Sequence, residues 1–277
     1  MQVIKVGGAL GPMLSNVCND IHTLVGRGET LVVVHGGSLD TNELADQLGQ
    51  PIRYLTAPSG MRSRYTDPAT LDVLTMAMLG RVKARIVAQL VRLGVRAVGL
   101  SGLDAALVTA EKTPAVKAVV DDRLRVVRDD MTGRVTALNK DLLDLLLTAG
   151  YVPVISPPVL DPQVGPLNTD ADRLAALVAR TLGAESLILL SNVPGLLRDP
   201  SDPGSLVPTI PGDDIDHYLG LAQGRMRVKL LAAYEALTGG VPRVVLGDGR
   251  IDGPISAALA GLGTTLVANM PQEEIIR

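Results

Sequence analysis

The chain has 277 residues, enough for one large α/β domain or for two closely packed halves. Its 47% hydrophobic fraction excludes global disorder, and its net charge of −3 at pH 7 excludes a general polyanion binder. The absence of Phe and Trp, with only five Tyr, argues against a single-stranded nucleic-acid binder, which needs aromatic stacking surfaces. The core must therefore be filled by Leu, Val, Ile and Ala, a composition that suits parallel strands covered by helices.

The sequence also indicates the cellular compartment of the protein. A single cysteine, Cys18, excludes an intramolecular disulfide and a thiolate metal cluster. The opening MQVIKVGG has no apolar signal core behind a basic head, and the longest uncharged stretch, 253–272, contains Pro and Gly. We therefore expect a cytoplasmic protein without a membrane span.

Short apolar runs recur along the chain, and most of them lack the alternation of a half-exposed strand. Such runs, separated by helices, predict a mostly parallel sheet covered on both faces. The expected strands are Val3–Val6, Leu31–Val34, Ala97–Leu100, Val152–Ile155, Leu187–Leu190, Arg243–Leu246 and Thr265–Val267.

The segments between these strands carry apolar residues at helical spacing. Between residues 116 and 137 the pattern changes, because VKAVV, RLRVVR and GRVTA are typical of short antiparallel strands. These three segments predict a small hairpin sheet that projects from the main sheet. The expected helices are Leu39–Leu48, Pro68–Leu93, Lys140–Ala149, Ala171–Leu182 and Met226–Leu237.

Two glycine turns follow the first two predicted strands. Lys5-Val6-Gly7-Gly8 places a cation beside bare backbone, and His35-Gly36-Gly37-Ser38 leads into a helix whose N-terminus favours an anion. Either turn alone could be a plain strand-to-helix connection. Together they predict one phosphate-binding crevice. A histidine that ends a buried strand is typically structural, so a role of His35 as general base is the less favoured interpretation.

Three later segments also carry polar groups at strand or helix ends. Asn168-Thr169-Asp170-Ala171-Asp172 opens a predicted helix, where Asp170 or Thr169 could cap the helix and Asp172 could hold lysines in position. LLSNVPGLL (189–197) ends a strand, and GRMRVK (224–229) places Lys229 in the second turn of a helix. A lone helical lysine is more typically a solvated charge. No glycine precedes a lysine and no GxGxxG follows a strand, which argues against P-loop NTPases and Rossmann dehydrogenases.

Read in order, KVGG, HGGS, NTDAD, LLSNVPGLL and GRMRVK resemble the amino acid kinase family, and within it the acetylglutamate kinase group. The resemblance covers nearly the whole chain. It implies an open αβα sandwich with a mainly parallel sheet, in which one domain, 1–277, has two halves. The half of about 1–160 would bind an acyl substrate, and the half of about 161–277 would bind ATP with Mg²⁺ held by the ATP phosphates and water.

The resemblance also assigns roles to matching residues. Lys5 and Lys229 would lie beside the transferred phosphoryl group, and Asp172 would organise both. The acyl substrate would be bound by Gly36, Gly37, Ser38, Arg62, Arg64 and Asn168, with Arg62 on its α-carboxylate and Asn168 on its amide portion. The nucleotide would be bound by Gly7, Gly8, Ser191, Asn192, Val193, Gly195, Leu196 and Met226. No protein metal ligand is implied.

Three positions depart from the common pattern of the group. Ser38 replaces a third glycine, Asp170 replaces an asparagine, and the segment RSRYTD (62–67) is longer than the usual Arg-Val-Thr-Asp. The longer form resembles the lysine-biosynthesis branch of the family. That branch phosphorylates the side-chain carboxylate of α-aminoadipate while its amino group is attached to a small acidic carrier protein.

Basic residues offer a surface for such a carrier, although solvated helix charge or subunit contacts explain them equally well. They are Arg81, Lys83, Arg85, Arg92 and Arg96 on the long helix region, and Arg123, Arg125, Arg128 and Arg134 in the predicted hairpin.

The resemblance implies transfer of the γ-phosphoryl group of ATP to a carboxylate. A carboxylate is already ionised at neutral pH, so no general base is needed. Three alternatives stay open: an N-acetyl-L-glutamate 5-kinase with the same catalytic residues, a nicotinamide-dependent oxidoreductase, and a non-catalytic nucleotide-binding sensor. A homo-oligomer, with a dimer favoured, is also expected.

Overall fold

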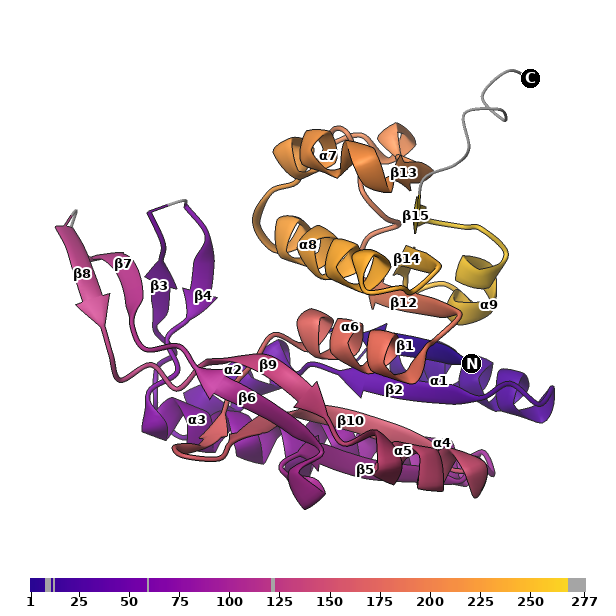
Figure 1. Ribbon diagram of the computed structural model, residues 1–277, viewed down its shortest axis with the longest axis horizontal. Coiled ribbons are helices and arrows are strands. Elements are labelled where there is room, and N and C mark those ends of the chain that lie inside the picture. The colour runs from indigo at the N-terminus through magenta and orange to yellow at the C-terminus, as the bar shows by residue number, and fades with distance from the viewer. Residues whose placement is uncertain (8–10, 12, 59, 121–122, 269–277) are drawn as a thin grey trace.

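The computed structural model describes residues 1–7, 11, 13–58, 60–120 and 123–268. A large, mainly parallel sheet forms its centre (Figure 1). The strands follow one another across this sheet in the order β13 (Thr209–Pro211), β15 (Thr264–Val267), β14 (Arg243–Asp248), β12 (Ser186–Ser191), β1 (Gln2–Val6), β2 (Leu31–His35), β10 (Val152–Asp161), β6 (Val108–Lys112) and β9 (Gly133–Leu138), while β5 (Ala97–Gly102) and β11 (Gly165–Leu167) also pair with β10.

All seven strands predicted from apolar runs are present in this sheet, so the predicted fold class is confirmed. The central strands β1, β2 and β12 are buried along almost their whole length because helices cover both faces. The last predicted strand, β15, pairs antiparallel with β14 and parallel with β13. This arrangement ends the parallel order of the sheet at that edge.

Helices cover the two faces of the sheet with separate apolar clusters. One face carries α5 (Lys140–Thr148), α6 (Ala171–Leu182), α7 (Ile215–Leu221) and α8 (Gly224–Thr238). The other face carries α1 (Leu14–Gly26), α4 (Ala84–Arg92) and α9 (Pro254–Leu259). These two layers give the αβα sandwich.

The long helix predicted over Pro68–Leu93 is present in three consecutive segments. It begins as α3 (Pro68–Thr75), continues as a π-helical segment, Met76–Lys83, and ends as α4. Asp67 caps its N-terminus by accepting a hydrogen bond from Thr70 N at 2.8 Å. A π-helical segment within a helix is frequently found beside a functional site, and this one packs against α2 (Ser38–Gln47).

A second, smaller antiparallel sheet projects from the body of the molecule (Figure 1). Its order is β4 (Arg62–Arg64), β3 (Tyr54–Thr56), β7 (Val116–Val120) and β8 (Arg123–Val127). The predicted hairpin of VKAVV and RLRVVR is therefore confirmed. The assignment of GRVTA to that sheet is wrong, because β9 pairs with β6 in the main sheet. The pairing of β3 and β4 with this hairpin was not predicted.

Within the described part of the chain, no helix is both long and apolar enough to cross a membrane.

Candidate active site

The register of three central strands places the predicted site at one edge of the sheet. Val6 of β1 lies opposite His35 of β2 on one side and opposite Leu190 of β12 on the other. The turns that follow these strands therefore begin side by side at the carboxyl edge. This edge is where ligands bind in open α/β sheets.

Two lysines and an aspartate from three elements meet at this edge. Lys5 Nζ, on β1, lies 2.8 Å from Asp172 Oδ1, and Lys229 Nζ, on α8, lies 2.9 Å from the same oxygen. All three side chains are almost completely buried, with exposed fractions of 8% for each lysine and 10% for Asp172. The structure thus brings together the three residues predicted to be catalytic.

The local sequence explains how Asp172 reaches this position. Asp170 caps α6 by accepting hydrogen bonds from Asp172 N at 2.9 Å and Arg173 N at 3.1 Å. Asp172 therefore lies in the first turn of a fixed helix and is directed at β1 and α8. The aspartate that replaces an asparagine at position 170 acts as a helix cap.

The charges of Lys5, Asp172 and Lys229, called here the triad, do not cancel. Burial would raise the pKa of Asp172, but the ammonium groups of Lys229 and Lys5 outweigh burial and hold its pKa well below the usual range. Burial lowers the pKa of Lys229. The carboxylate of Asp172 acts to raise this pKa, but the nearby ammonium of Lys5 opposes that effect. Two ammonium groups facing one carboxylate leave an excess of positive charge that an anionic phosphoryl group would neutralise.

The glycines of the two turns allow close packing, whereas the N–H groups of Gly7 and Gly36 are already paired. Gly7 N donates to Leu190 O at 3.1 Å and Gly36 N donates to Val6 O at 3.2 Å, so both N–H groups extend the sheet. A Cβ atom on Gly37 would lie 2.8 Å from Sδ of Met78 in the π-helical segment. Gly8, predicted to bind the nucleotide, lies outside the described residues.

His35 is fully buried. Leu31 and Val33 of β2 pack on the face that carries α1 and α4, and the alternation of side chains along the strand places His35 on the same face. Its Nδ1 lies 2.9 Å from the carbonyl of Gly36, and because a carbonyl only accepts, Nδ1 carries the proton. Burial lowers the pKa of His35 to about 4, against a smaller opposing effect of the Gly36 hydrogen bond. A neutral imidazole in this position supports the structural interpretation.

The residues predicted to bind the acyl substrate lie on the turn after β2, on β4 of the small sheet and, for Asn168, directly after β11. Arg62 is exposed and stacks on the ring of Tyr54, with its guanidinium carbon 4.2 Å from the ring centre. Arg64 is half-buried and donates from Nη2 to Ser38 O at 3.1 Å. Asn168 Nδ2 donates to Thr66 Oγ1 at 3.2 Å. These hydrogen bonds connect β4 and the following segment to the edge of the main sheet.

Arg225 joins this group although it was not among the predicted residues. Its Nη1 donates to Ser38 Oγ at 3.1 Å, across 187 positions of sequence. The only local signal was a cation in the first turn of a helix, where the helix dipole disfavours positive charge. Ser38, where the group has a glycine, is therefore in contact with α8 through Arg225.

The predicted nucleotide segment follows β12. Leu196 is buried and its N–H donates to Thr264 Oγ1 at 2.9 Å, which fixes the turn on β15. Ser191 Oγ donates to Val193 O at 3.5 Å within the turn. Asn192 is exposed, and Met226 packs partly buried against the core of the α6 and α8 face.

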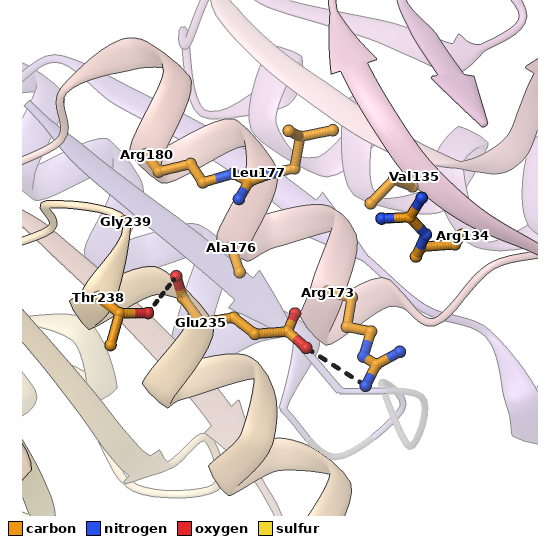
Figure 2. A pocket seen from close by; sticks show the side chains of 9 residues that line it. All are labelled: Arg134, Val135, Arg173, Ala176, Leu177, Arg180, Glu235, Thr238 and Gly239. Carbon is orange, nitrogen blue, oxygen red and sulfur yellow. Dashed lines mark hydrogen bonds and ion pairs between the residues drawn. The ribbon is translucent and has the colours of Figure 1, made fainter. Parts of the chain in front are cut away.

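Most of the predicted basic surface is divided between separate regions. Arg85 forms an ion pair with Asp40 at 2.8 Å, and Arg81 donates to Gln47 Oε1 at 2.6 Å, so both hold α2 against the long helix. Arg134 lies on β9 of the main sheet. It lines a cavity of about 310 Å³ between α6 and α8, where Arg173 forms an ion pair with Glu235 at 3.2 Å (Figure 2). The lining of this cavity contains none of the predicted site residues.

No group of three or more His, Cys, Asp or Glu side chains that could hold a metal ion is found among the described residues. The polar lining of the site is instead cationic. Such a lining fits an anionic phosphate that brings its own metal ion.

Comparison with known proteins identifies the class of this fold and site. A sequence model of the amino acid kinase family matches residues 1–248. The chain therefore belongs to the amino acid kinase family, which confirms the predicted family and kinase class. Membership in this family argues against the nicotinamide-dependent oxidoreductase alternative.

Two curated relatives narrow the comparison within the family. A protein of Deinococcus radiodurans named "[LysW]-aminoadipate kinase" is 48% identical over 266 residues, which cover 96% of this chain and 91% of the relative. A protein of Thermus thermophilus with the same name is 48% identical over 268 residues, covering 96% of this chain and 100% of the relative. This similarity confirms the predicted resemblance to the lysine-biosynthesis branch.

Solved structures share the fold. N-acetylglutamate synthase from Neisseria gonorrhoeae, solved with coenzyme A and N-acetyl-glutamate, superposes with a TM-score of 0.79 at 27% identity. The match covers 98% of this chain and 60% of that protein. This chain thus spans only part of the longer synthase.

Proposed function

We propose that this chain is an ATP-dependent kinase that phosphorylates the side-chain carboxylate of L-2-aminoadipate while the amino group of that substrate is attached to a small acidic carrier protein. The observation that carries the proposal is the pair of buried ammonium groups, Lys5 and Lys229, on one oxygen of Asp172. The names of the two curated relatives support the choice of substrate and carrier.

The chemistry needs little beyond position and charge. The acceptor carboxylate is ionised at neutral pH, so it can attack the γ-phosphorus without a general base. As the bond to the leaving oxygen breaks, negative charge spreads over the phosphoryl oxygens. Lys5 and Lys229 are already in place to stabilise this charge, so no reorganisation is needed during transfer.

We assign acyl-substrate binding to the half of about 1–160, with Asn168 beside it. A guanidinium binds a carboxylate through two parallel hydrogen bonds, so Arg62 and Arg64 are suited to the non-reacting carboxylate. Asn168 could contact the amide that links the substrate to its carrier. Gly36, Gly37 and Ser38 provide the N-terminus of α2, which favours an anionic group.

We assign ATP binding to the half of about 161–277, together with the turn after β1. The residues proposed to line the nucleotide site are Gly7, Gly8, Ser191, Asn192, Val193, Gly195, Leu196 and Met226. Mg²⁺ held by the ATP phosphates and water would add positive charge that offsets the negative charge of the phosphoryl group.

We place the carrier on the small sheet. Its outer face exposes apolar side chains, Val119 at 40%, Leu124 at 61% and Val126 at 48%, beside the exposed cation Lys117. Arg125 is also exposed, on the other side of the edge strand β8, where it lies opposite Ala118. An apolar centre with a charged border is typical of a transient protein interface. The positive border is complementary to an acidic carrier.

We further propose that the enzyme acts in the cytoplasm as a homodimer. Cys18 is a free, buried thiol, which agrees with a reducing compartment. Met76 and Val91 on the long helix are 50% and 54% exposed, so apolar surface is available there for a second subunit.

A substrate comparison tests the proposal. The full chain with MgATP should convert carrier-linked aminoadipate to an acyl phosphate, trapped with hydroxylamine as a hydroxamate, with a kcat/KM at least roughly 100-fold above that for N-acetyl-L-glutamate. Equal or better turnover of N-acetyl-L-glutamate would instead support the N-acetyl-L-glutamate 5-kinase alternative. Absence of turnover with every acceptor would support the non-catalytic sensor.

The triad is tested in the same assay. Lys229→Met should lower kcat roughly 100- to 1000-fold, because it removes one preorganised donor. Lys140→Met is the matched control, since Lys140 is an exposed partner of Asp144 on α5 and should leave kcat unchanged. A Lys229→Met enzyme with near-normal turnover contradicts the catalytic assignment.

A further inference from the structure

Ser38 is joined to two arginines from opposite parts of the chain. Its hydroxyl accepts from Arg225 Nη1 at 3.1 Å, and its carbonyl accepts from Arg64 Nη2 at 3.1 Å. Ser38 is the first residue of α2, whereas Arg225 is the second residue of α8. This serine thus forms a direct contact between the helix that follows β2 and the helix that carries Lys229.

Within the described part of the chain, the two guanidinium groups have no carboxylate partner, since neither Arg64 nor Arg225 has a carboxylate within ion-pair distance. Nη1 of Arg64 is buried and has no hydrogen-bond partner in the described part of the chain. Two like charges and an unused buried donor beside a helix N-terminus form a site that an anion would stabilise.

The position of Arg225 is electrostatically unfavourable unless its guanidinium binds an anion. The first turn of a helix repels a cation, because unpaired N–H groups give this end a partial positive charge. Arg225 is also exposed, so it does not fill space in the core. Its contact with Ser38 directs the guanidinium across the site toward the acyl-substrate side.

The position of Arg225 on α8 links this contact to catalysis. Arg225 and Lys229 are four residues apart and therefore lie on the same side of the helix. Lys229 in turn contacts Asp172 at 2.9 Å. A ligand that holds Arg225 therefore also holds the turn of α8 that presents Lys229 to the phosphoryl group.

We propose that Arg225 is a positioning residue that completes the site for the non-reacting carboxylate of the acyl substrate from the nucleotide side, and so couples acyl-substrate binding to ATP binding. This inference rests on the proposed function for the identity of the acyl substrate. The carboxylate lies between Arg64 and Arg225 and removes their mutual repulsion. Because coupling is reciprocal, ATP bound beside α8 raises the affinity for the acyl substrate by the same factor.

Binding measurements test this coupling without turnover. The dissociation constant of the non-hydrolysable analogue adenylyl imidodiphosphate with Mg²⁺ is measured by calorimetry, with and without saturating carrier-linked aminoadipate. The wild-type chain should bind the analogue about tenfold more tightly when the acyl substrate is present. Arg225→Gln should reduce this factor to less than twofold, and Arg225→Lys should restore part of it.

Two further variants separate positioning from structure and from general charge. Ser38→Gly removes the hydroxyl acceptor and should weaken the coupling, whereas Arg134→Gln, which removes an equal charge on β9, should leave it at the wild-type value. A purely structural contact would lower the melting temperature of Arg225→Gln and leave the coupling factor unchanged. That result, or a wild-type chain without coupling, overturns the inference.

The outcome is distinguishable from failure of the proposed function. Turnover of carrier-linked aminoadipate by the wild-type chain is measured on the same preparation. Wild-type turnover with unchanged coupling in Arg225→Gln overturns only the role of Arg225. Absence of acyl-substrate binding to the wild-type chain overturns the proposed function itself, and with it this inference.

Discussion

At the scale of single residues, the site is defined by an unequal number of buried charges. Asp172 faces two ammonium groups within 2.9 Å, and no other ion pair in the described part of the chain joins three side chains. Removing Asp172 would leave two buried like charges without compensation, a change that is typically strongly destabilising. The same excess charge attracts a phosphate.

His35 predicts a pH dependence of stability. Burial lowers its pKa from the ordinary value of 6.5 to about 4, so between these values the unfolded chain binds a proton that the folded chain does not. The free energy of unfolding therefore falls as pH is lowered from 6.5 to about 4, by a total on the order of 3 kcal/mol, and is independent of this residue above 6.5.

Urea unfolding at a series of pH values measures this slope. Asp130 contributes with the opposite sign, because burial raises its pKa, so the comparison is made with a His35→Asn variant in which only the histidine is lost. The variant should be less stable at neutral pH and should lose less stability on acidification. Parallel profiles for the two proteins would contradict a buried neutral His35.

At the scale of elements, the turn after β12 is held by one contact with the neighbouring strand. Thr264 Oγ1 accepts from Leu196 N at 2.9 Å and donates to Val207 O at 2.6 Å. Gly195 lies directly against this hydroxyl, since an added Cβ would be 2.5 Å from Thr264 Oγ1 and 2.9 Å from Leu206 Cδ1. The glycine thus permits the close packing that shapes the proposed nucleotide turn.

Gly195→Ala should therefore lower the free energy of unfolding by about 1–3 kcal/mol and raise the KM for ATP, because the turn must move away from β15. Gly220→Ala is the matched control. Among the described residues outside the adjoining backbone of α7, no atom lies within 4 Å of the added Cβ, and alanine favours a helix by up to about 1 kcal/mol. Equal stability of the two variants in urea, with equal KM values, would show that the packing at Gly195 is unimportant.

At the scale of the whole molecule, the projecting sheet is connected to the site through buried polar contacts. Thr66, which follows β4, is fully buried. Its N–H donates to Asp130 Oδ1 at 2.7 Å, and its hydroxyl accepts from Asn168 at 3.2 Å. A partner bound to the small sheet would therefore lie at a fixed orientation relative to the proposed substrate side of the main sheet.

Charge reversal on the small sheet tests the proposed docking of the carrier. Lys117→Glu combined with Arg125→Glu should lower kcat/KM for carrier-linked aminoadipate by about tenfold or more at low salt and weaken its salt dependence, since electrostatic steering is lost. The KM for ATP should not change. Arg27→Glu, an exposed change at the C-terminal end of α1, is the control. Equal effects of both reversals would indicate nonspecific attraction and contradict a docking site on this sheet.

Several features could be predicted from local sequence because burial on both faces leaves a continuous apolar run. This applies to the central strands, such as Leu31–His35 and Ser186–Ser191. Helix α1 was missed although Val17, Cys18, Ile21 and Leu24 carry the helical spacing of a buried face. Strands β3 and β4 gave no such signal, because they are three residues long and largely polar.

The sequence by itself determined the fold class, the family and the candidate catalytic residues, because apolar patterning and motif order are local properties of the chain. Only the tertiary structure decided which of these groups meet: Lys5, Asp172 and Lys229 come from three elements whose approach depends on the order of strands in the sheet. The same holds for β9, which joined the main sheet, and for the contact of Arg225 with Ser38. Contacts between distant segments depend on pairing and packing, which local sequence patterns do not specify.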